Sequence, residues 1–270
     1  MSVNRNKVKR VLVTIAIVYG LLLIYGCAWQ RRLLYFPSKL TDADAKTLAA
    51  QENFRAWQNR SGDIIGWKLP ASDSPTASVM ILHGNAGNAL GRGYIAQPIH
   101  EAGGMDVFVL EYPGYGARAG SPGKTSWLQA AEEAFALLAK NKPIYLVSES
   151  LGTGAAAHLA KSFPTQVAGI AMLVPYDSLP SLAQNKMPLL LPYLFLADRY
   201  EPAAWLKSYR GPVKIVIAGR DEIIPPKFGQ RLFDSLECRK SLQVIPDAGH
   251  DDVAAQSADW WRAVFDFWQH

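Results

Sequence analysis

The sequence has little of what stabilises small disulfide-rich or metal-dependent domains. Only two cysteines occur in 270 residues, and one of them, Cys27, lies inside a long apolar run. No disulfide is therefore expected, and the cysteine content does not indicate a redox compartment. Histidines, cysteines and carboxylates form no group with the spacing of metal ligands. Neither a metal nor another cofactor is expected.

Acidic residues are absent from the first 32 residues, which hold six basic ones. The rest of the chain has 22 basic and 23 acidic residues, so the net charge of +5 belongs to the N-terminal segment. A nucleic-acid-binding domain needs a basic face. The nearly neutral body therefore excludes nucleic acid as an expected partner.

Charge is also absent from Val11 to Trp29, a run of 19 residues. A helix of that length is about 28 Å long, close to the hydrocarbon thickness of a bilayer. Basic residues flank the run on both sides, and the positive-inside rule places the N-terminus in the cytoplasm and the body outside. We expect residues 1–32 to be a cytoplasmic tail and a single-pass signal-anchor helix, with the membrane as a partner.

Three alternatives to a retained anchor exist for this run. A buried core helix would show a polar face, and this run has only Thr14 as a polar break. A cleaved signal peptide needs a small-x-small cleavage site, which is hard to find here. Ile24–Tyr25–Gly26–Cys27 loosely resembles a lipobox. A lipoprotein anchored at Cys27 therefore stays open as the alternative localisation.

Beyond the apolar run, strands and helices alternate without internal repeats. A hairpin signal at 59–63 joins the first two strands, and strong helices are expected at 126–140 and 254–268. Later apolar strands are expected at 77–82, 106–110, 144–147, 167–174, 213–218 and 242–245. Such strands predict an α/β fold with a mostly parallel sheet covered by helices on both faces. Residues 33–270 are expected to form one domain whose site lies where the strands end.

One turn in this domain has the pattern of a reactive serine. Ser148–Glu149–Ser150–Leu151–Gly152 joins an apolar strand to an alanine-rich helix. It nearly matches G-x-S-x-G, in which the serine is held on a strained turn above the sheet. Ser148 replaces the first glycine, at a position that must be small because strand and helix pass closely. Ser150 is the candidate nucleophile, and an ordinary turn serine is the alternative.

A serine hydroxyl needs a base to take its proton and a third group to orient that base. His250 follows the last strand in a loop, which suits a base. Asp221 follows the preceding strand, and the order serine, acid, histidine is typical of this architecture. Asp177 is the rival acid. The other histidines are less suitable by position: His83, His100, His158 and His270.

An oxyanion hole needs two backbone N–H groups aimed where negative charge develops. One is expected from Leu151, which follows the nucleophile at a helix N-terminus. The other is expected from Asn85, in the loop that begins at His83, and His83 is expected to hold this loop in shape. The alternative for 83–88 is a glycine-rich turn or a phosphate loop, although the Lys-Ser/Thr of a P-loop is missing.

Together these pieces make the chain similar to the α/β-hydrolase superfamily. It most resembles the Bem46/ABHD13-like branch of membrane-anchored serine hydrolases, over about residues 33–268. The matching motifs are LYFP at 34–37, LHGNAGN at 82–88, EYPGYG at 111–116, SLGTG at 150–154, GRDEIIP at 219–225 and GH at 249–250. The resemblance implies an eight-stranded, mostly parallel sheet and a triad of Ser150, Asp221 and His250.

The segment 178–211 is expected to be an insertion near the site. Its centre, 187–196, has no polar side chain except the hydroxyl of Tyr193. It is either a lid or membrane-facing surface that admits acyl chains, or a helix packed on the core. We expect a membrane-tethered serine hydrolase that cleaves esters or thioesters of small-molecule or lipid-like substrates. A serine peptidase and a non-catalytic membrane-bound scaffold are the alternatives.

Overall fold

The computed structural model describes residues 5–70, 74–138 and 141–270. Its main sheet has eight strands in the order β10-β9-β8-β7-β4-β6-β3-β2, and the pairs from β10 to β6 are parallel. The strands are β2 (Arg55–Gln58), β3 (Ile64–Lys68), β4 (Ala77–Leu82), β6 (Met105–Leu110), β7 (Ile144–Glu149), β8 (Val167–Leu173), β9 (Val213–Ala218) and β10 (Lys240–Ile245). The predicted α/β fold with an eight-stranded, mostly parallel sheet is confirmed.

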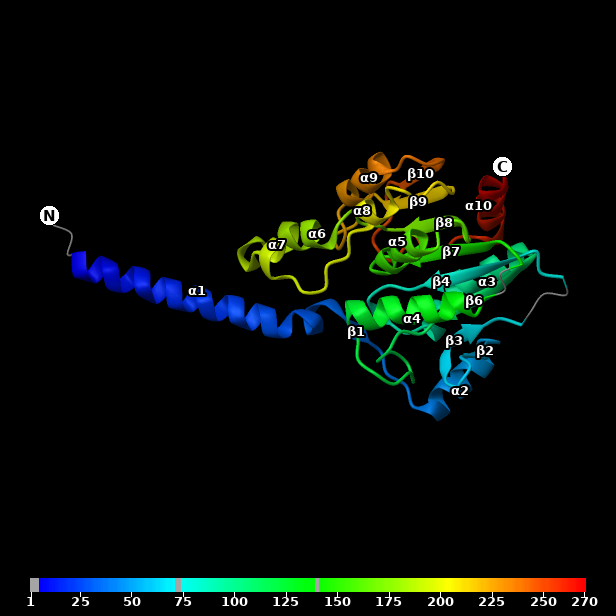
Figure 1. Ribbon diagram of the computed structural model, residues 1–270, viewed down its shortest axis with the longest axis horizontal. Helices are drawn as coiled ribbons and strands as arrows, with labels where there is room; N and C mark the ends of the chain where they lie inside the picture. Colours follow the sequence, from blue (N-terminus) through cyan, green and yellow to red (C-terminus); the bar gives the residue numbers. More distant parts are fainter. Residues whose placement is uncertain (1–4, 71–73, 139–140) are drawn as a thin grey trace.

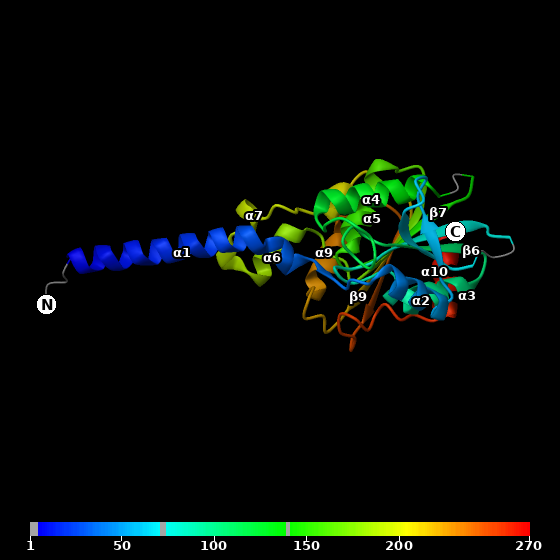
Figure 2. The ribbon, with the colours of Figure 1, turned by 90° about the horizontal axis from the view of Figure 1, so that it is seen from below.

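Helices cover both faces of this sheet (Figures 1 and 2). One layer consists of α4 (Lys124–Ala136), α5 (Gly152–Ser162), α8 (Pro202–Leu206) and α9 (Pro226–Ser235). The other contains α2 (Asp42–Gln51), η1 (Leu90–Arg92), α3 (Gly93–Ala102) and α10 (Ala258–Gln269). Every residue of β4 and β7 is buried. These two central strands therefore carry the continuous apolar runs that a doubly covered sheet requires.

The structure differs from the predicted elements in a few places. The helix predicted at 126–140 is α4, which ends at Ala136, and residues 139–140 lie outside the described residues. The helix predicted at 254–268 begins only at Ala258, where the Ser257 side chain accepts a hydrogen bond from the Trp260 N–H and caps it. The helix α9 was not predicted. A short parallel pair, β1 (Phe36–Pro37) with β5 (Ala86–Gly87), was not predicted either.

The N-terminal helix α1 (Arg5–Leu34) projects from the body, and none of its residues is buried. It is the one described helix that is long and apolar enough to cross a membrane. Beside it lie α6 (Leu179–Lys186), η2 (Pro188–Leu190) and α7 (Pro192–Phe195), which belong to the 178–211 insertion (Figures 1 and 2).

The apolar centre of the insertion lies largely at the surface. The side chains of Leu189 and Leu194 are 69% and 74% exposed. The alternative that this segment packs into the core is therefore wrong for these side chains. Its role as a lid stays a prediction.

Candidate active site

Ser150 stands at the turn between β7 and α5, with a positive φ of 51°. Left-handed backbone is costly for a residue with a side chain, and such strain persists at functional sites because the surroundings enforce it. Ser148, the residue in place of the first motif glycine, is fully buried with its Oγ 3.4 Å from the Ala171 carbonyl oxygen. A serine therefore fits this position, and the strand-turn-helix geometry of a nucleophile elbow is present.

Gly152 sits where this turn passes closest to the neighbouring strand. A Cβ atom there would lie 2.0 Å from the Leu82 carbonyl oxygen and 2.7 Å from that of His83. Both are backbone atoms, so no side-chain movement can relieve the overlap. The second glycine of the motif is thus required by the packing of α5 against β4.

We expect Gly152→Ala to lower the free energy of unfolding by about 3 kcal/mol, because the added methyl overpacks a rigid site. The measurement is the midpoint of thermal unfolding in detergent. Gly91→Ala is the matched control, since its nearest neighbour would be the Asn88 Oδ1 at 3.6 Å. Equal midpoints for the two variants would contradict this account of the turn.

The loops after β9 and β10 bring the predicted acid and base to Ser150. The His250 Nε2 lies 3.1 Å from the Ser150 Oγ, and the His250 Nδ1 lies 2.7 Å from the Asp221 Oδ2. The Asp221 side chain is 1% exposed and that of His250 is 10% exposed. These distances and this order of groups are those of a serine nucleophile, a base and an orienting acid.

Asp221 is fixed by its own loop. Its Oδ1 accepts hydrogen bonds from the N–H groups of Ile223 at 2.9 Å and Ile224 at 2.7 Å, which leaves Oδ2 for the imidazole. The rival acid Asp177 pairs instead with Arg231 on α9, at 2.9 Å. The geometry therefore favours Asp221 over Asp177 as the partner of His250.

The loop after β4 passes directly over the serine. A Cβ atom on Gly84 would lie 3.3 Å from the Ser150 Cβ, which places the next residue, Asn85, beside the site. Among the described residues, the backbone N–H groups of Asn85 and Leu151 donate no hydrogen bond. Both are thus free to receive a developing oxyanion, as predicted for these two residues, and this role stays a prediction.

Three contacts hold Asn85, two of them from the end of α1 and β1. Its side-chain Nδ2 donates to the Leu34 carbonyl at 2.8 Å, and its carbonyl accepts from the Phe36 N–H at 2.8 Å and the Tyr115 hydroxyl at 2.7 Å. The candidate oxyanion loop is therefore bonded to the body end of the apolar helix. The sequence motif at 34–37 did not reveal this pairing.

The remaining histidines lie elsewhere. His83 is fully buried, its Nδ1 lies 2.8 Å from the Gly84 carbonyl oxygen, and its ring packs edge-on against Tyr112. It therefore shapes the loop, as expected. His158 on α5 pairs with Glu132 at 2.7 Å, and His270 is exposed at the end of α10.

A buried ion pair beside the serine was missed by sequence reasoning. Glu149 is 6% exposed, and its carboxylate lies 2.9 Å from the Arg92 Nε and 3.3 Å from the Tyr94 hydroxyl. Arg92 also donates to the Ala86 carbonyl at 2.7 Å and so links the strand before Ser150 to the candidate oxyanion loop. Burial and the Glu149 carboxylate raise the pKa of Tyr94, so this hydroxyl stays a neutral donor. In the sequence, this ion pair is indicated by the charged Glu149 at the end of an apolar strand.

Comparison with known proteins agrees with this fold. Residues 77–205 match the family described as alpha/beta hydrolase fold. A protein of Mycobacterium tuberculosis is 29% identical over 93% of this chain and 91% of its own length. A membrane protein of Saccharomyces cerevisiae is 26% identical over 76% of this chain and 74% of its own length.

Two further relatives carry informative names. The protein bem46 of Schizosaccharomyces pombe is 24% identical over 88% of this chain and 85% of its own length. The lysophosphatidylserine lipase ABHD12 of Danio rerio is 23% identical over 69% of this chain and 54% of its own length.

Among solved structures, an esterase of Pyrococcus furiosus superposes with a TM-score of 0.64 at 17% identity, over 87% of this chain and 98% of its own. At this identity the likeness concerns the fold alone. The family match, the relatives and the solved structures agree, so the chain has the α/β-hydrolase fold and is similar to the Bem46/ABHD-like group of hydrolases.

Proposed function

We propose that the protein is a membrane-tethered serine hydrolase that cleaves carboxylic esters or thioesters through an acyl-enzyme. His250 takes the proton of the Ser150 hydroxyl as the oxygen attacks the acyl carbonyl. Asp221 holds the imidazole with its proton on Nδ1 and stabilises the imidazolium that forms. The N–H groups of Asn85 and Leu151 receive the negative charge on the carbonyl oxygen.

The observation that carries this proposal is the continuous line of contacts from Asp221 through His250 to Ser150, at 2.7 Å and 3.1 Å. His250 then returns its proton to the leaving alcohol or thiol. In the second half-reaction it activates water, which releases the acid and restores the serine.

The proposal that the substrate is hydrophobic rests on α1 and on the exposed apolar insertion. Residues 1–32 would form the tail and anchor, with the 33–270 hydrolase domain outside the cytoplasm. A lipoprotein anchored at Cys27 is the alternative, and Cys27 is exposed on α1. A relative named as a lysophosphatidylserine lipase supports an acyl ester as the substrate class.

A fluorophosphonate probe tests the proposed nucleophile. The full chain is labelled in detergent, digested and analysed by mass spectrometry, and we expect the adduct on Ser150. An adduct on another residue, or none on folded protein, would contradict the proposal.

A substrate panel separates the alternatives. We expect turnover of p-nitrophenyl esters and acyl thioesters to exceed that of peptide amides. Preferred cleavage of amides would favour a peptidase on the same fold. Turnover of no acyl substrate by the folded protein would favour a non-catalytic scaffold.

A further inference from the structure

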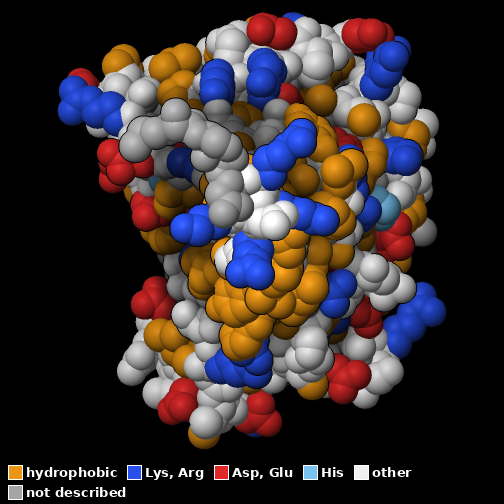
Figure 3. Space-filling view, turned by 90° about the vertical axis from the view of Figure 1, so that its left-hand side faces the viewer, with side chains coloured by type: hydrophobic (Ala, Val, Ile, Leu, Met, Phe, Trp, Pro, Cys, Tyr) orange, Lys and Arg blue, Asp and Glu red, His pale blue; other side chains and the backbone are white. Residues whose placement is uncertain are grey.

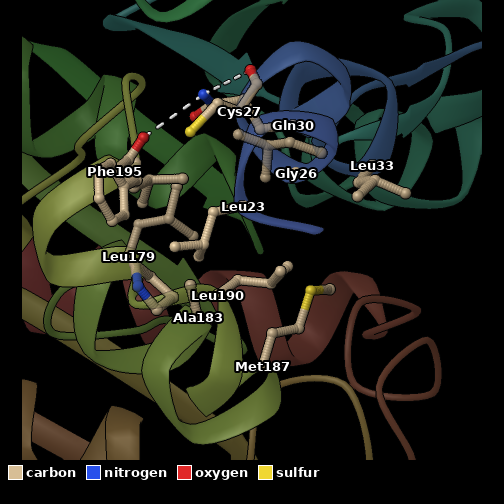
Figure 4. A pocket seen from close by; sticks show the side chains of 13 residues that line it. Leu23, Gly26, Cys27, Gln30, Leu33, Leu179, Ala183, Met187, Leu190 and Phe195 are labelled. Atoms are coloured by element: carbon tan, nitrogen blue, oxygen red, sulfur yellow. Dashed lines mark hydrogen bonds between the residues drawn. The ribbon is translucent and has the colours of Figure 1, made fainter. Parts of the chain in front are cut away.

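An apolar cavity lies between α1 and the insertion (Figure 4). It has a volume of about 110 Å³. Its walls come from one face of α1 and from the facing side of α6, η2 and α7: Leu23, Gly26, Cys27, Gln30, Leu33, Leu34, Leu179, Ala183, Met187, Leu190, Pro192, Phe195 and Leu196. An apolar cavity of roughly this size stays dry and takes hydrocarbon rather than water.

Gln30 is the one residue of this lining with a polar side-chain amide, and that amide is already bonded. Its Nε2 donates to the Cys27 carbonyl at 2.9 Å and lies 3.5 Å from the Phe195 carbonyl oxygen, and its Oε1 accepts from the Ala197 N–H at 2.7 Å. The cavity therefore offers its occupant hydrocarbon walls with no side-chain amide to bind. That chemistry suits an acyl chain and no polar ligand.

The insertion is fastened to α1 at several levels along the helix. The Tyr19 hydroxyl donates to the Leu189 carbonyl at 2.9 Å, Gln30 holds Phe195 and Ala197, and near the body Arg31 binds the buried Asp198 at 3.1 Å. The two segments thus keep a fixed depth relative to each other. Wherever α1 lies in a bilayer, the insertion lies beside it.

The depth of the insertion in a bilayer follows from the rise per residue of α1. Trp29 and Arg32 are in cation–π contact, an arrangement suited to the headgroup layer. Tyr19 lies ten residues before Trp29, about 15 Å along the helix. About 15 Å is half the hydrocarbon thickness of a bilayer. Leu189, bonded to Tyr19, therefore lies near the middle of the membrane when α1 spans it.

Several polar backbone groups of the insertion tip, 187–196, are paired or missing, as a hydrocarbon environment requires. Polar backbone groups in hydrocarbon must be paired, and non-helical segments are tolerated only where that holds. Pro188 and Pro192 have no N–H group, and side chains supply donors to three carbonyls: Tyr19 to Leu189, Arg199 to Tyr193 and Gln30 to Phe195. The other side chains of this tip are apolar and exposed. Figure 3 shows an apolar area at the end of the molecule from which α1 projects, with Lys and Arg side chains around it.

We propose that the insertion enters the bilayer beside α1 and that the cavity between them binds one acyl chain of a membrane lipid. This inference rests on the proposed function and membrane anchor. The cavity runs from Leu23, in the hydrocarbon layer, to Leu34, about 16 Å along the helix. Leu34 is hydrogen-bonded to Asn85 of the candidate oxyanion loop. The Leu34 end of the cavity is thus the end nearer the candidate active site, and the proposal places the carboxyl end of the acyl chain there.

Two glycines of α1 supply a matched pair of variants. A side chain on Gly26 grows into the cavity, since its Cβ would lie 3.2 Å from the Leu190 Cδ2. Gly20, six residues earlier on α1, has no atom within 4 Å of such a Cβ. Gly26→Leu therefore fills the cavity and Gly20→Leu does not, with the same change in helix composition.

The test uses the full Ser150→Ala chain, so that binding is read without hydrolysis. It is placed in nanodiscs of phosphatidylcholine whose acyl chain carries a diazirine, and the photoadducts are mapped by mass spectrometry. We expect adducts on the sheltered wall, at Leu179 and Ala183, as well as on the exposed Leu189 and Leu194. Gly26→Leu should lower the wall adducts about tenfold and Gly20→Leu should not.

Absence of wall adducts, or equal wall adducts in the two glycine variants, would overturn the proposal. Adducts on Leu189 and Leu194 report that the insertion keeps its place in Gly26→Leu. Ala183→Leu fills the cavity from the opposite wall and should give the same loss.

Kinetics on active protein distinguish this inference from the proposed function. Gly26→Leu should lower the ratio of kcat/KM for dodecanoyl over butanoyl ester about tenfold. An unchanged ratio in an active hydrolase would reject the cavity as the acyl site and leave the hydrolase intact. Wall adducts in a chain without hydrolase activity would reject the proposed function and leave the lipid site intact.

Discussion

Replacing Asp221 with asparagine is expected to lower kcat for ester hydrolysis about 10⁴-fold while the protein keeps its fold. The two N–H groups of Ile223 and Ile224 require an oxygen at the Oδ1 position, so the asparagine carbonyl takes that place. Its NH₂ group then faces the His250 Nδ1, which must accept the hydrogen bond. The imidazole proton moves to Nε2, and the nitrogen beside Ser150 can no longer act as a base.

Asp177→Asn is the matched control, because Asp177 was the rival acid and pairs with Arg231. We expect this variant to change kcat by less than about threefold, as befits a partly exposed ion pair. Initial rates on a p-nitrophenyl ester and the thermal midpoint of each variant supply the comparison. A large loss in Asp177→Asn with activity kept in Asp221→Asn would exchange the two assignments.

The second large effect is expected at the nucleophile. Ser150→Ala and His250→Ala should each lower kcat about 10⁶-fold, and the double variant should lose little more, because the two groups act as one unit. Residual turnover would then come from substrate binding and the two N–H donors. Additive losses, with the double variant far below either single one, would show that the groups act independently.

A control for the histidine uses the other imidazole that pairs with a carboxylate. His158 on α5 lies 2.7 Å from Glu132 on α4 and does not contact Asp221 or Ser150 among the described hydrogen bonds, so His158→Ala should leave kcat within about threefold. Burst titration with a fluorophosphonate measures the fraction of intact enzyme in each preparation. This measurement separates the activity of contaminating unsubstituted enzyme from the residual activity of the variant.

The sequence predicted the main elements because each rests on a local signal. The apolar runs of β4, β7, β8 and β9 predicted buried parallel strands, and the structure has them within a residue or two. The group of Ser150, Asp221 and His250 was predicted for a similar reason, since each residue follows its own strand. The carboxyl ends of neighbouring parallel strands meet at one edge of a sheet.

What the sequence did not reveal depends on contacts between distant segments. The pairing of β1 with β5 involves only two residues on each side, too few for a periodic pattern. The ion pair of Glu149 with Arg92 joins residues 57 positions apart, and neither position shows its partner. Leu189 and Leu194 are exposed because η2 and α7 lie beside α1 and not on the core. The composition of the segment alone could not distinguish these two positions.

The hydrogen bond between Leu34, at the end of α1, and Asn85, in the candidate oxyanion loop, has a practical consequence for anyone who wishes to study residues 33–270 alone. Leu34 and Phe36 together provide an acceptor and a donor for Asn85, and Tyr35 anchors the same stretch to Asp198 at 3.0 Å. A water-soluble form that begins after Pro37 would keep all three proposed triad residues and still lose the support of its oxyanion loop. Soluble forms should therefore begin before Leu34, because the end of α1 supports the candidate oxyanion loop.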